Sequence, residues 1–158
     1  GLGPERDPNS DIDATLLFEL PFHAVFPPGH ALAARERVRW ADLVDHPLIT
    51  LQGQFTERLS VDLHNAMREG ELDPATTVTF MSTALSMVAA GLGVTICIPY
   101  AASLVNLYRL DMRQLVEPEV TRRFYVFSRN GRSLSPAAQS FREALFGYVA
   151  REGAFAGR

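Results

Sequence analysis

The sequence predicts an α/β protein built around a mostly parallel sheet, and three observations lead to that fold class. Short apolar and β-branched runs alternate with helix-length segments along the chain. Between Pro74 and Tyr108 there is no Asp, Glu, Lys or Arg. Within that uncharged stretch, a helix-forming segment leads through two glycines into a strand that is apolar on both faces, as is typical of parallel sheets covered by helices.

The chain opens with two apolar runs that a proline separates. Thr15 to Leu20 is expected to be a connecting strand, and Phe22 to Phe26 a core strand that ends in a Pro-Pro-Gly turn. A short helical turn is predicted for Trp40 to Val44, followed by a second buried strand with the sequence PLITL from Pro47 to Leu51.

A helix is expected after the polar loop from Gln52 to Phe55. Thr56 supplies a capping hydroxyl, Glu57 suits the positive end of the helix dipole, and Gly70 ends the helix. A third strand is then predicted from Thr77 to Met81. Strand, helix, strand, helix and strand therefore follow one another, which favours parallel pairing through right-handed crossovers.

The sequence STALSMVAAGLGVTICIP, inside the uncharged stretch, has two incompatible interpretations. Its length allows a membrane span, which takes about 20 apolar residues. Its glycines and proline favour a different order: Ser82 caps a helix over Thr83 to Ala90, Gly91 terminates that helix, and Val94 to Ile98 forms a buried strand closed by Pro99. We interpret the segment as the interior of a soluble α/β domain.

The last quarter of the chain repeats the strand and helix pattern. Phe124 to Ser128 (FYVFS) is expected to be a strand, and Ser135 to cap a helix that has Pro136 at its first position. Apolar residues then recur at helical spacing up to Gly153. The segment from Val116 to Val120 is the expected linker between the two parts.

Composition and motifs exclude several functions. The 158 residues carry a net charge of −3, and all fifteen cationic residues are scattered arginines, so no basic face for nucleic acid is visible. Cys97 is the only cysteine, which rules out an intrachain disulfide and indicates a small buried side chain. The N-terminal residues contain no secretory signal.

No catalytic or cofactor-binding motif is recognisable. The four histidines have no metal-ligand spacing, so we expect no metal, and no cofactor is expected either. The GLGV glycines follow a helix and lead into a strand, which is the reverse of a dinucleotide-binding loop. No acid, base and nucleophile set can be assembled, so the chain is not expected to be an enzyme.

Two strand-to-helix junctions are the most suggestive features of the sequence. One is the loop from Gln52 to Thr56, and the other is formed by Ser82 and Thr83. Such junctions lie at the carboxyl ends of parallel strands, where open α/β sheets bind ligands, and helix N-termini favour anions. The alternative is that Thr56 and Ser82 only cap their helices. Spacing leaves both interpretations open.

Four stretches carry a resemblance to a known family. They are FHAVFPPGHALA, VRWADLVDHPLITL, STALSMVAAGLGVTICIP and TRRFYVFSRNGRSLSPAAQSFREAL, which cover most of the chain from Leu20 to Leu145. In this order and spacing the chain resembles the effector-binding domain of LysR-type transcriptional regulators. The resemblance implies a fold like that of type II periplasmic binding proteins, with two α/β subdomains joined by crossover strands and a small effector between them.

The resemblance also implies a domain division and a set of effector-binding residues. Residues 1–20 are an N-terminal segment with a crossover strand, residues 21–122 a nearly complete second regulatory subdomain, and residues 123–158 a C-terminal strand and helix of the first subdomain. The effector-binding residues implied are Gln52, Gln54, Phe55, Thr56, Ser82, Thr83, Pro99 and Tyr100. Their side chains and backbone donors suit a carboxylate or another polar small molecule.

The family pattern predicts partners and a missing part. It implies a cytoplasmic homo-oligomer, such as a dimer, that has no membrane contact and meets DNA only through a helix-turn-helix domain outside this chain. The opening half of the first subdomain, about 70 residues, is also expected to be missing, with GLGP resembling its last residues. The C-terminal strand and helix would then have no sheet beneath them, so we expect self-association through the apolar residues Phe141, Leu145, Tyr148 and Val149.

Two other functional classes stay open at this point. A solute-binding protein of the same fold would serve transport and would need an export signal. An enzyme on the same architecture is disfavoured because its catalytic groups are not recognisable.

Overall fold

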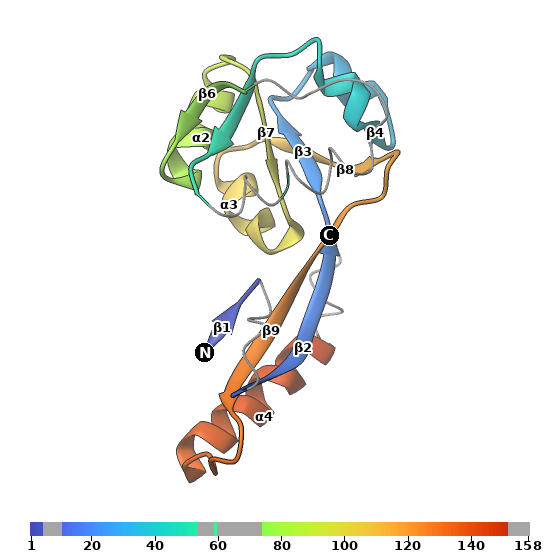
Figure 1. Cartoon of the computed structure of the whole chain (residues 1–158). Coiled ribbons are helices and arrows are strands. Elements are labelled where there is room, and N and C mark those ends of the chain that lie inside the picture. The colour runs from blue at the N-terminus through green and yellow to red at the C-terminus, as the bar shows by residue number, and fades with distance from the viewer. Residues whose placement is uncertain (5–10, 54–58, 60–73, 152–158) are drawn as a thin grey trace. The chain divides into compact units, whose positions relative to one another are not determined.

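The computed structural model describes residues 1–4, 11–53, 59 and 74–151 of the chain (Figure 1). The chain divides into two compact units, one over Pro21–Val120 and the other formed by Gly1–Leu20 together with Thr121–Arg158. Within the described residues, no helix is both long enough and apolar enough to span a membrane.

The Pro21–Val120 unit contains a six-stranded sheet in the order β4-β8-β3-β7-β5-β6. Its strands are β3 (His23–Phe26), β4 (Val38–Arg39), β5 (Leu48–Leu51), β6 (Pro74–Val78), β7 (Val94–Cys97) and β8 (Asp111–Val116). The pairs β4 with β8, β7 with β5 and β5 with β6 are parallel, whereas β3 runs antiparallel to both of its neighbours. The mostly parallel α/β sheet predicted from the sequence is confirmed.

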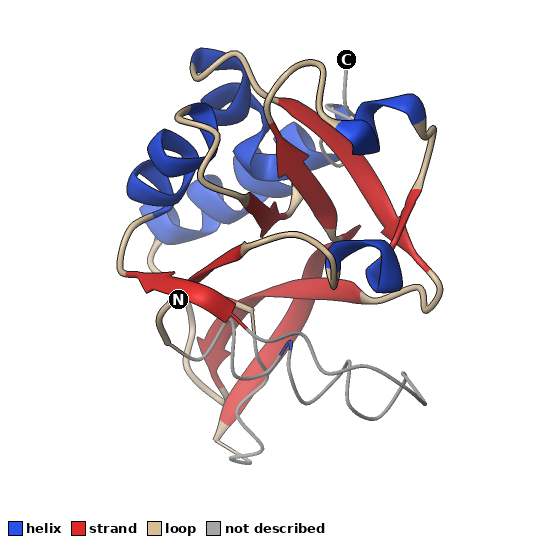
Figure 2. Ribbon diagram, turned by 90° about the horizontal axis from the view of Figure 1, so that it is seen from above, coloured by secondary structure: helices blue, strands red, loops and turns tan. Residues whose placement is uncertain are grey.

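Helices connect these strands and lie beside the twisted sheet (Figure 2). They are the 3₁₀ turns η1 (Ala31–Ala34), η2 (Trp40–Leu43) and η3 (Pro99–Ala101), and the α-helices α2 (Met81–Ala89) and α3 (Ala102–Leu107). The short turn expected near Trp40 is therefore present. The helix expected from Thr56 to Gly70 lies outside the described residues, apart from the buried Leu59.

One face of the sheet is covered by α2 and α3, and the buried core lies between these helices and the sheet. Val25, Ile49, Leu85 and Val88 belong to this core and have at most 1% of their surface exposed. A second packed group surrounds Trp40, which is fully buried, lies edge to face with Phe22 at 5.9 Å between ring centroids, and donates its indole N–H to the Pro118 carbonyl over 2.9 Å.

The turn from α2 into β7 has the form predicted from the sequence. Gly91 ends the helix with a φ of 75°, a left-handed value that glycine adopts without strain. Gly93 follows and lies directly against the backbone of Pro47: a β-carbon added there would be 2.2 Å from the Pro47 carbonyl oxygen. That same oxygen accepts a hydrogen bond from the Val94 N–H at 2.9 Å, so glycine permits the strand to approach this closely.

The second unit contains a three-stranded sheet and one long helix. The strands β1 (Leu2–Gly3), β2 (Ile12–Pro21) and β9 (Thr121–Arg129) lie in the order β1-β9-β2, and the helix is α4 (Pro136–Arg151). Phe18 of β2 stacks on Phe124 of β9 with 4.8 Å between ring centroids. The Ala138 N–H donates to the Ser135 hydroxyl over 3.3 Å, which confirms Ser135 as the helix cap.

The expectation that the C-terminal strand and helix have no sheet beneath them is wrong. β9 is paired on both sides, and Val149 of α4 has only 7% of its surface exposed. The apolar stripe of α4 is nevertheless incompletely covered, because Phe141 is 63% exposed and Tyr148 48% exposed.

Several boundaries differ from those predicted. β6 ends at Val78 rather than at Met81, because Met81 is already the first residue of α2. The segments that form β8 and α3 were not predicted as elements, and the expected linker from Val116 begins with the last residue of β8.

Candidate functional site

Three parallel strands end at one edge of the six-stranded sheet. β5 pairs in parallel with both β6 and β7, so the carboxyl ends of all three lie at the same edge. Gln52 follows β5, Phe80 precedes α2 just after β6, and Pro99 follows β7 closely. Ligands of open α/β sheets bind at this kind of edge. The structure therefore brings the described members of the predicted site to a common edge.

The loop after β5 is anchored by its first residue. The Gln52 N–H donates to the Val78 carbonyl over 2.8 Å, while the Gln52 side chain is exposed. Gly53 then turns the chain with a φ of 111°. The other predicted site residues of this loop, Gln54, Phe55 and Thr56, lie outside the described residues.

The first turn of α2 carries no side-chain cap. Phe80 is the N-cap residue, makes no side-chain capping bond, and accepts main-chain hydrogen bonds from Thr83 at 3.1 Å and Ala84 at 3.2 Å. Ser82 is the second residue of the helix rather than its cap, so the capping interpretation of Ser82 is wrong. Both Ser82 and Thr83 are exposed on this first turn.

Ser82 also has a role inside the helix. Its carbonyl accepts a hydrogen bond from the Ser86 hydroxyl over 2.9 Å, one turn further on. This bond uses the main chain of Ser82. The Ser82 side chain is therefore not required for it.

The two predicted residues that follow β7 have different roles. Pro99 is buried and is the first residue of η3, where its fixed φ suits the start of a helical turn. Tyr100 is 49% exposed, and desolvation by burial, together with the nearby Cys97, raises the pKa of its hydroxyl. Tyr100 therefore stays protonated at neutral pH and can both donate and accept a hydrogen bond.

The start of α2 gives this edge a partial positive charge. None of the described residues from Pro74 to Tyr108 has an ionised carboxylate, ammonium or guanidinium group. The positive end of α2 favours a polar or anionic group. No group of three or more His, Cys, Asp or Glu side chains that could hold a metal ion exists among the described residues.

Phe80 is a candidate site residue that the sequence did not reveal. It is 67% exposed at the start of α2, whereas the sequence placed it inside a strand. The spacing of Met81, Leu85 and Val88 on the core side of α2 was the available signal, because it fits a helix that begins directly after Phe80.

Cys97 is buried at the end of β7, as the sequence indicated. Its thiol is 1% exposed, lies 3.6 Å from the Met112 sulfur, and has its pKa raised by burial to about 12. A thiol in this state is almost entirely protonated at neutral pH, so it is a packing group rather than a nucleophile.

The chain matches known proteins along nearly its whole length. It matches the LysR substrate binding domain family over residues 1–149. It is 31% identical over 147 residues to the uncharacterized HTH-type transcriptional regulator YbhD of Escherichia coli (strain K12), with 89% of this chain and 44% of that protein covered.

A second curated relative agrees with this match. The relative is a probable hydrogen peroxide-inducible genes activator of Mycobacterium avium, which is 35% identical over 136 residues, with 84% of this chain and 42% of that protein covered. This chain therefore spans less than half the length of these two curated relatives.

One solved structure that matches this chain is the BenM effector binding domain with its effector benzoate. It superimposes with a TM-score of 0.81 at 22% identity, with 100% of this chain and 72% of that chain covered, which shows a shared fold. The type II periplasmic-binding-protein-like fold expected from the sequence is thereby confirmed. Since the family match extends over residues 1–149, this chain belongs to the LysR substrate binding domain family of transcriptional regulators.

Proposed function

We propose that this chain is the ligand-sensing regulatory domain of a LysR-type transcription factor, and that a small polar or anionic effector binds at the carboxyl edge of β5, β6 and β7. The effector controls transcription through a DNA-binding part that this chain does not include. The domain acts by binding rather than by catalysis, in the cytoplasm where the DNA is, and as a homo-oligomer.

One observation carries the placement of the effector. The first turn of α2 has no side-chain cap, exposes Ser82 and Thr83, and lies beside the ends of two other parallel strands. Helix N-termini stabilise anions through their N–H groups and dipole, and hydroxyls add hydrogen bonds. The exposed aromatic side chains of Phe80 and Tyr100 supply apolar surface for the body of such a ligand.

The remaining predicted residues complete the proposal. In this proposal Gln52, Gln54 and Thr56 contribute polar side chains after β5 and Phe55 contributes an apolar one. Pro99 sets the direction of the chain that presents Tyr100. Residues 21–122, which include the whole Pro21–Val120 unit, are the second regulatory subdomain in this proposal. Residues 1–20 and 123–158 belong to the first subdomain and its crossover strands.

The transport alternative is not favoured. The matched family and the relatives named above are transcriptional regulators. The similarity to them extends over most of the length of this chain. A solute-binding role in transport is supported by neither the family match nor these relatives.

Removing the hydroxyls of α2 is expected to weaken effector binding. In the double variant Ser82→Ala and Thr83→Val, the dissociation constant should rise about a hundredfold or more, because each of the two hydrogen bonds to a charged group contributes about 1.5 kcal/mol or more. Isothermal titration calorimetry on the longest available chain measures this effect. The first probe is benzoate, followed by other small carboxylates until one binds.

The matched control is Ser86→Ala on the same helix. Ser86 donates to the Ser82 carbonyl at 2.9 Å and lies one turn beyond the proposed site, so its removal should leave affinity within about twofold. If the double variant and this control bind the effector equally well, the effector lies elsewhere.

The similarity to the probable hydrogen peroxide-inducible genes activator of Mycobacterium avium suggests peroxide sensing as a second candidate function. A thiol that senses peroxide must be accessible and deprotonated. Cys97, the only cysteine of this chain, is 1% exposed and has a pKa of about 12. These properties do not support thiol-based peroxide sensing by this chain.

Hydrogen peroxide is therefore expected to leave Cys97 unmodified in the folded protein. The chain is treated with peroxide and the sulfenic acid reagent dimedone, and its intact mass is recorded. No adduct is expected under native conditions, because the thiol is buried and protonated. The same treatment in urea should produce the adduct. Modification of the native protein at the rate of the unfolded one would contradict the structure.

A further inference from the structure

His23 lies at the same edge of the six-stranded sheet as the proposed effector site. β3 runs antiparallel to β7, and its first residue, His23, is opposite Cys97, the last residue of β7 (Figure 1). β7 pairs in parallel with β5, and β5 pairs in parallel with β6. The start of β3 is therefore at the edge where the other three strands end.

The side chain of His23 lies at the margin of the buried core. Val25, two residues further along β3, is part of the core beside α2 and α3, and alternate residues of a strand share one face. Cys97 belongs to the same core, whereas His23 is only partly buried. The imidazole thus stands where the packed core meets the open edge, close to the turn η3 that carries Tyr100.

One nitrogen of the His23 ring has a partner and the other is free. Nδ1 is 3.2 Å from the Pro21 carbonyl oxygen. A carbonyl only accepts hydrogen bonds, so Nδ1 carries the proton and Nε2 of the neutral ring is an acceptor. Among the described residues, Nε2 has no hydrogen-bond partner, and it is not a fully enclosed atom.

The ring of His23 is mainly neutral at pH 7. Burial lowers the pKa of His23, and the hydrogen bond to Pro21, which raises it, does not cancel this effect. The residue opposite His23 on β8 is the uncharged Gln114, and the elements from α2 to α3 contain no Asp, Glu, Lys or Arg. Nε2 therefore presents a lone pair rather than a positive charge.

This acceptor distinguishes His23 from the other groups of the edge. The hydroxyls of Ser82, Thr83 and Tyr100 and the amide of Gln52 can each donate and accept a hydrogen bond, and the first N–H groups of α2 only donate. A carboxylate suits the start of α2 but has no proton to offer to Nε2 of His23. A hydroxyl group has one.

The width of the edge fits a small molecule that carries both groups. Only β7 separates β3 from β5 in the sheet. Neighbouring strands are about 4.8 Å apart, so the ends of β3 and β5 are about 10 Å apart. A six-membered ring with a carboxylate on one side and a hydroxyl on the other, together with its hydrogen bonds, fits a span of this size.

We infer that His23 determines effector specificity, and that its Nε2 atom accepts a hydrogen bond from a hydroxyl group of the effector. The effector is then a hydroxycarboxylate, whose carboxylate meets the start of α2 and whose hydroxyl meets the start of β3. This inference rests on the proposed function and adds a second polar contact to it.

Two substitutions at His23 separate the roles of its two nitrogens. In His23→Asn, the amide nitrogen corresponds to Nδ1 and can still donate to the Pro21 carbonyl, but the acceptor at Nε2 is lost. In His23→Gln, the longer side chain brings an amide oxygen to the position of Nε2, but the bond to Pro21 is lost. A purely structural role predicts that glutamine is the more harmful change, whereas the inference predicts that asparagine alone removes selectivity.

Isothermal titration calorimetry on the longest available chain measures the selectivity. The ligands are benzoate and the tighter binding of 3-hydroxybenzoate and 4-hydroxybenzoate. The unsubstituted protein should prefer the hydroxybenzoate about fivefold to tenfold, the effect of one hydrogen bond. The preference should fall to about twofold or less in His23→Asn and stay at about threefold or more in His23→Gln, with benzoate affinity within about twofold in both.

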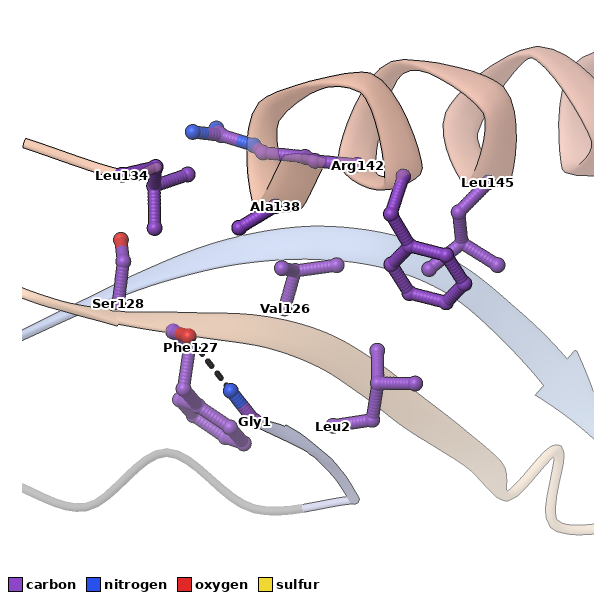
Figure 3. Close-up of a pocket in the computed structure, with 10 residues that line it drawn as sticks. Gly1, Leu2, Val126, Phe127, Ser128, Leu134, Ala138, Arg142 and Leu145 are labelled. Atoms are coloured by element: carbon purple, nitrogen blue, oxygen red, sulfur yellow. Dashed lines mark hydrogen bonds between the residues drawn. The ribbon is translucent and has the colours of Figure 1, made fainter. Parts of the chain in front are cut away.

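An apolar groove in the other unit is the alternative place for an aromatic carboxylate, and it supplies a control. It has a volume of about 320 Å³, and Val126, Ala138, Leu145 and Arg142 are among its lining residues. In Figure 3, Val126 points from the strand toward α4, and Ala138 and Leu145 point back toward it. The variant Ala138→Phe places a ring in this groove and should leave all dissociation constants within about twofold.

Three outcomes would overturn the inference. They are equal affinity of the unsubstituted protein for benzoate and the hydroxybenzoates, a full preference that persists in His23→Asn, and loss of the preference in Ala138→Phe. Absence of binding by all three benzoates would also overturn it. The titrations of Ser82→Ala with Thr83→Val, which extend to other carboxylates, decide the proposed function separately.

Discussion

Replacing Gly93 by alanine is expected to lower the free energy of unfolding of the Pro21–Val120 unit by about 3 to 4 kcal/mol, since overpacking against rigid backbone and a positive φ both contribute. The added β-carbon would meet the Pro47 carbonyl oxygen at 2.2 Å and its carbonyl carbon at 3.1 Å. Backbone cannot rotate away as a flexible side chain can. The hydrogen bond from Val94 to Pro47 must therefore lengthen, and β7 must shift against the end of η2 and the start of β5.

Urea denaturation followed by tryptophan fluorescence measures this loss. Trp40 is the only tryptophan of the chain and is fully buried in this unit, so its emission reports on the unfolding of Pro21–Val120. Gly91→Ala is the matched control, because Gly91 has a φ of 75° but no atom within 4 Å of an added β-carbon. It should lose only about 1 kcal/mol, from the left-handed backbone alone. Equal losses in both variants would show that the approach to Pro47 is not the decisive contact.

Trp40→Ala is expected to have the largest effect of all, a loss of about 4 kcal/mol, because it removes a fully buried indole from the core. The side chain packs edge to face on Phe22 with 5.9 Å between ring centroids and donates to the Pro118 carbonyl at 2.9 Å. Both contacts tie η2 to distant parts of the same unit. Far-UV circular dichroism during urea denaturation follows the unfolding, since the fluorescent group itself is removed.

Trp40→Phe separates packing from hydrogen bonding at this position. The phenyl ring keeps most of the contact with Phe22, whereas the Pro118 carbonyl loses its indole donor. A loss of about 2 kcal/mol is expected from the missing hydrogen bond and the smaller ring together. A loss as large as that of Trp40→Ala would instead make the hydrogen bond dominant. No loss at all would mean that the bond to Pro118 contributes nothing to stability.

Elements with strong local patterns were predictable from the sequence. The apolar runs of β5, β7 and β9 were identified because each is a continuous run of residues that favour strands. The end of α2 was identified because Gly91 and Gly93 have physical reasons to be glycine. The start of α4 was identified from a serine followed by proline, and its cap is present.

Elements with weak local patterns were missed, and β8 shows why. Its sequence, DMRQLV, contains charged and polar residues that do not indicate a central strand. In the structure β8 pairs with β3 on one side and β4 on the other. The Arg113 guanidinium is accommodated because it donates to the carbonyls of Arg35 and Met112. Both pairings join residues that are distant in sequence, so the local sequence pattern does not indicate them.

The start of α2 was misplaced for a related reason. Ser82 is a good capping residue, and its presence drew the predicted start of the helix to Thr83. In the structure Phe80 is the N-cap instead, because Met81 already packs against the core on the same side of α2 as Leu85 and Val88. The predicted polar residues Ser82 and Thr83 remain at the edge, but the aromatic residue beside them was not predicted.

The ends of the Pro21–Val120 unit are held together, and this has a consequence for folding order. The Phe22 N–H donates to the Val120 carbonyl at 3.3 Å, so the chain enters and leaves the unit at neighbouring points. Once this unit has folded, the loop that separates β2 from β9 shrinks in effect from about 100 residues to a few, which removes most of the loop-closure entropy that opposes their pairing. The folded Pro21–Val120 unit thus holds the ends of β2 and β9 close together, which favours assembly of the discontinuous unit.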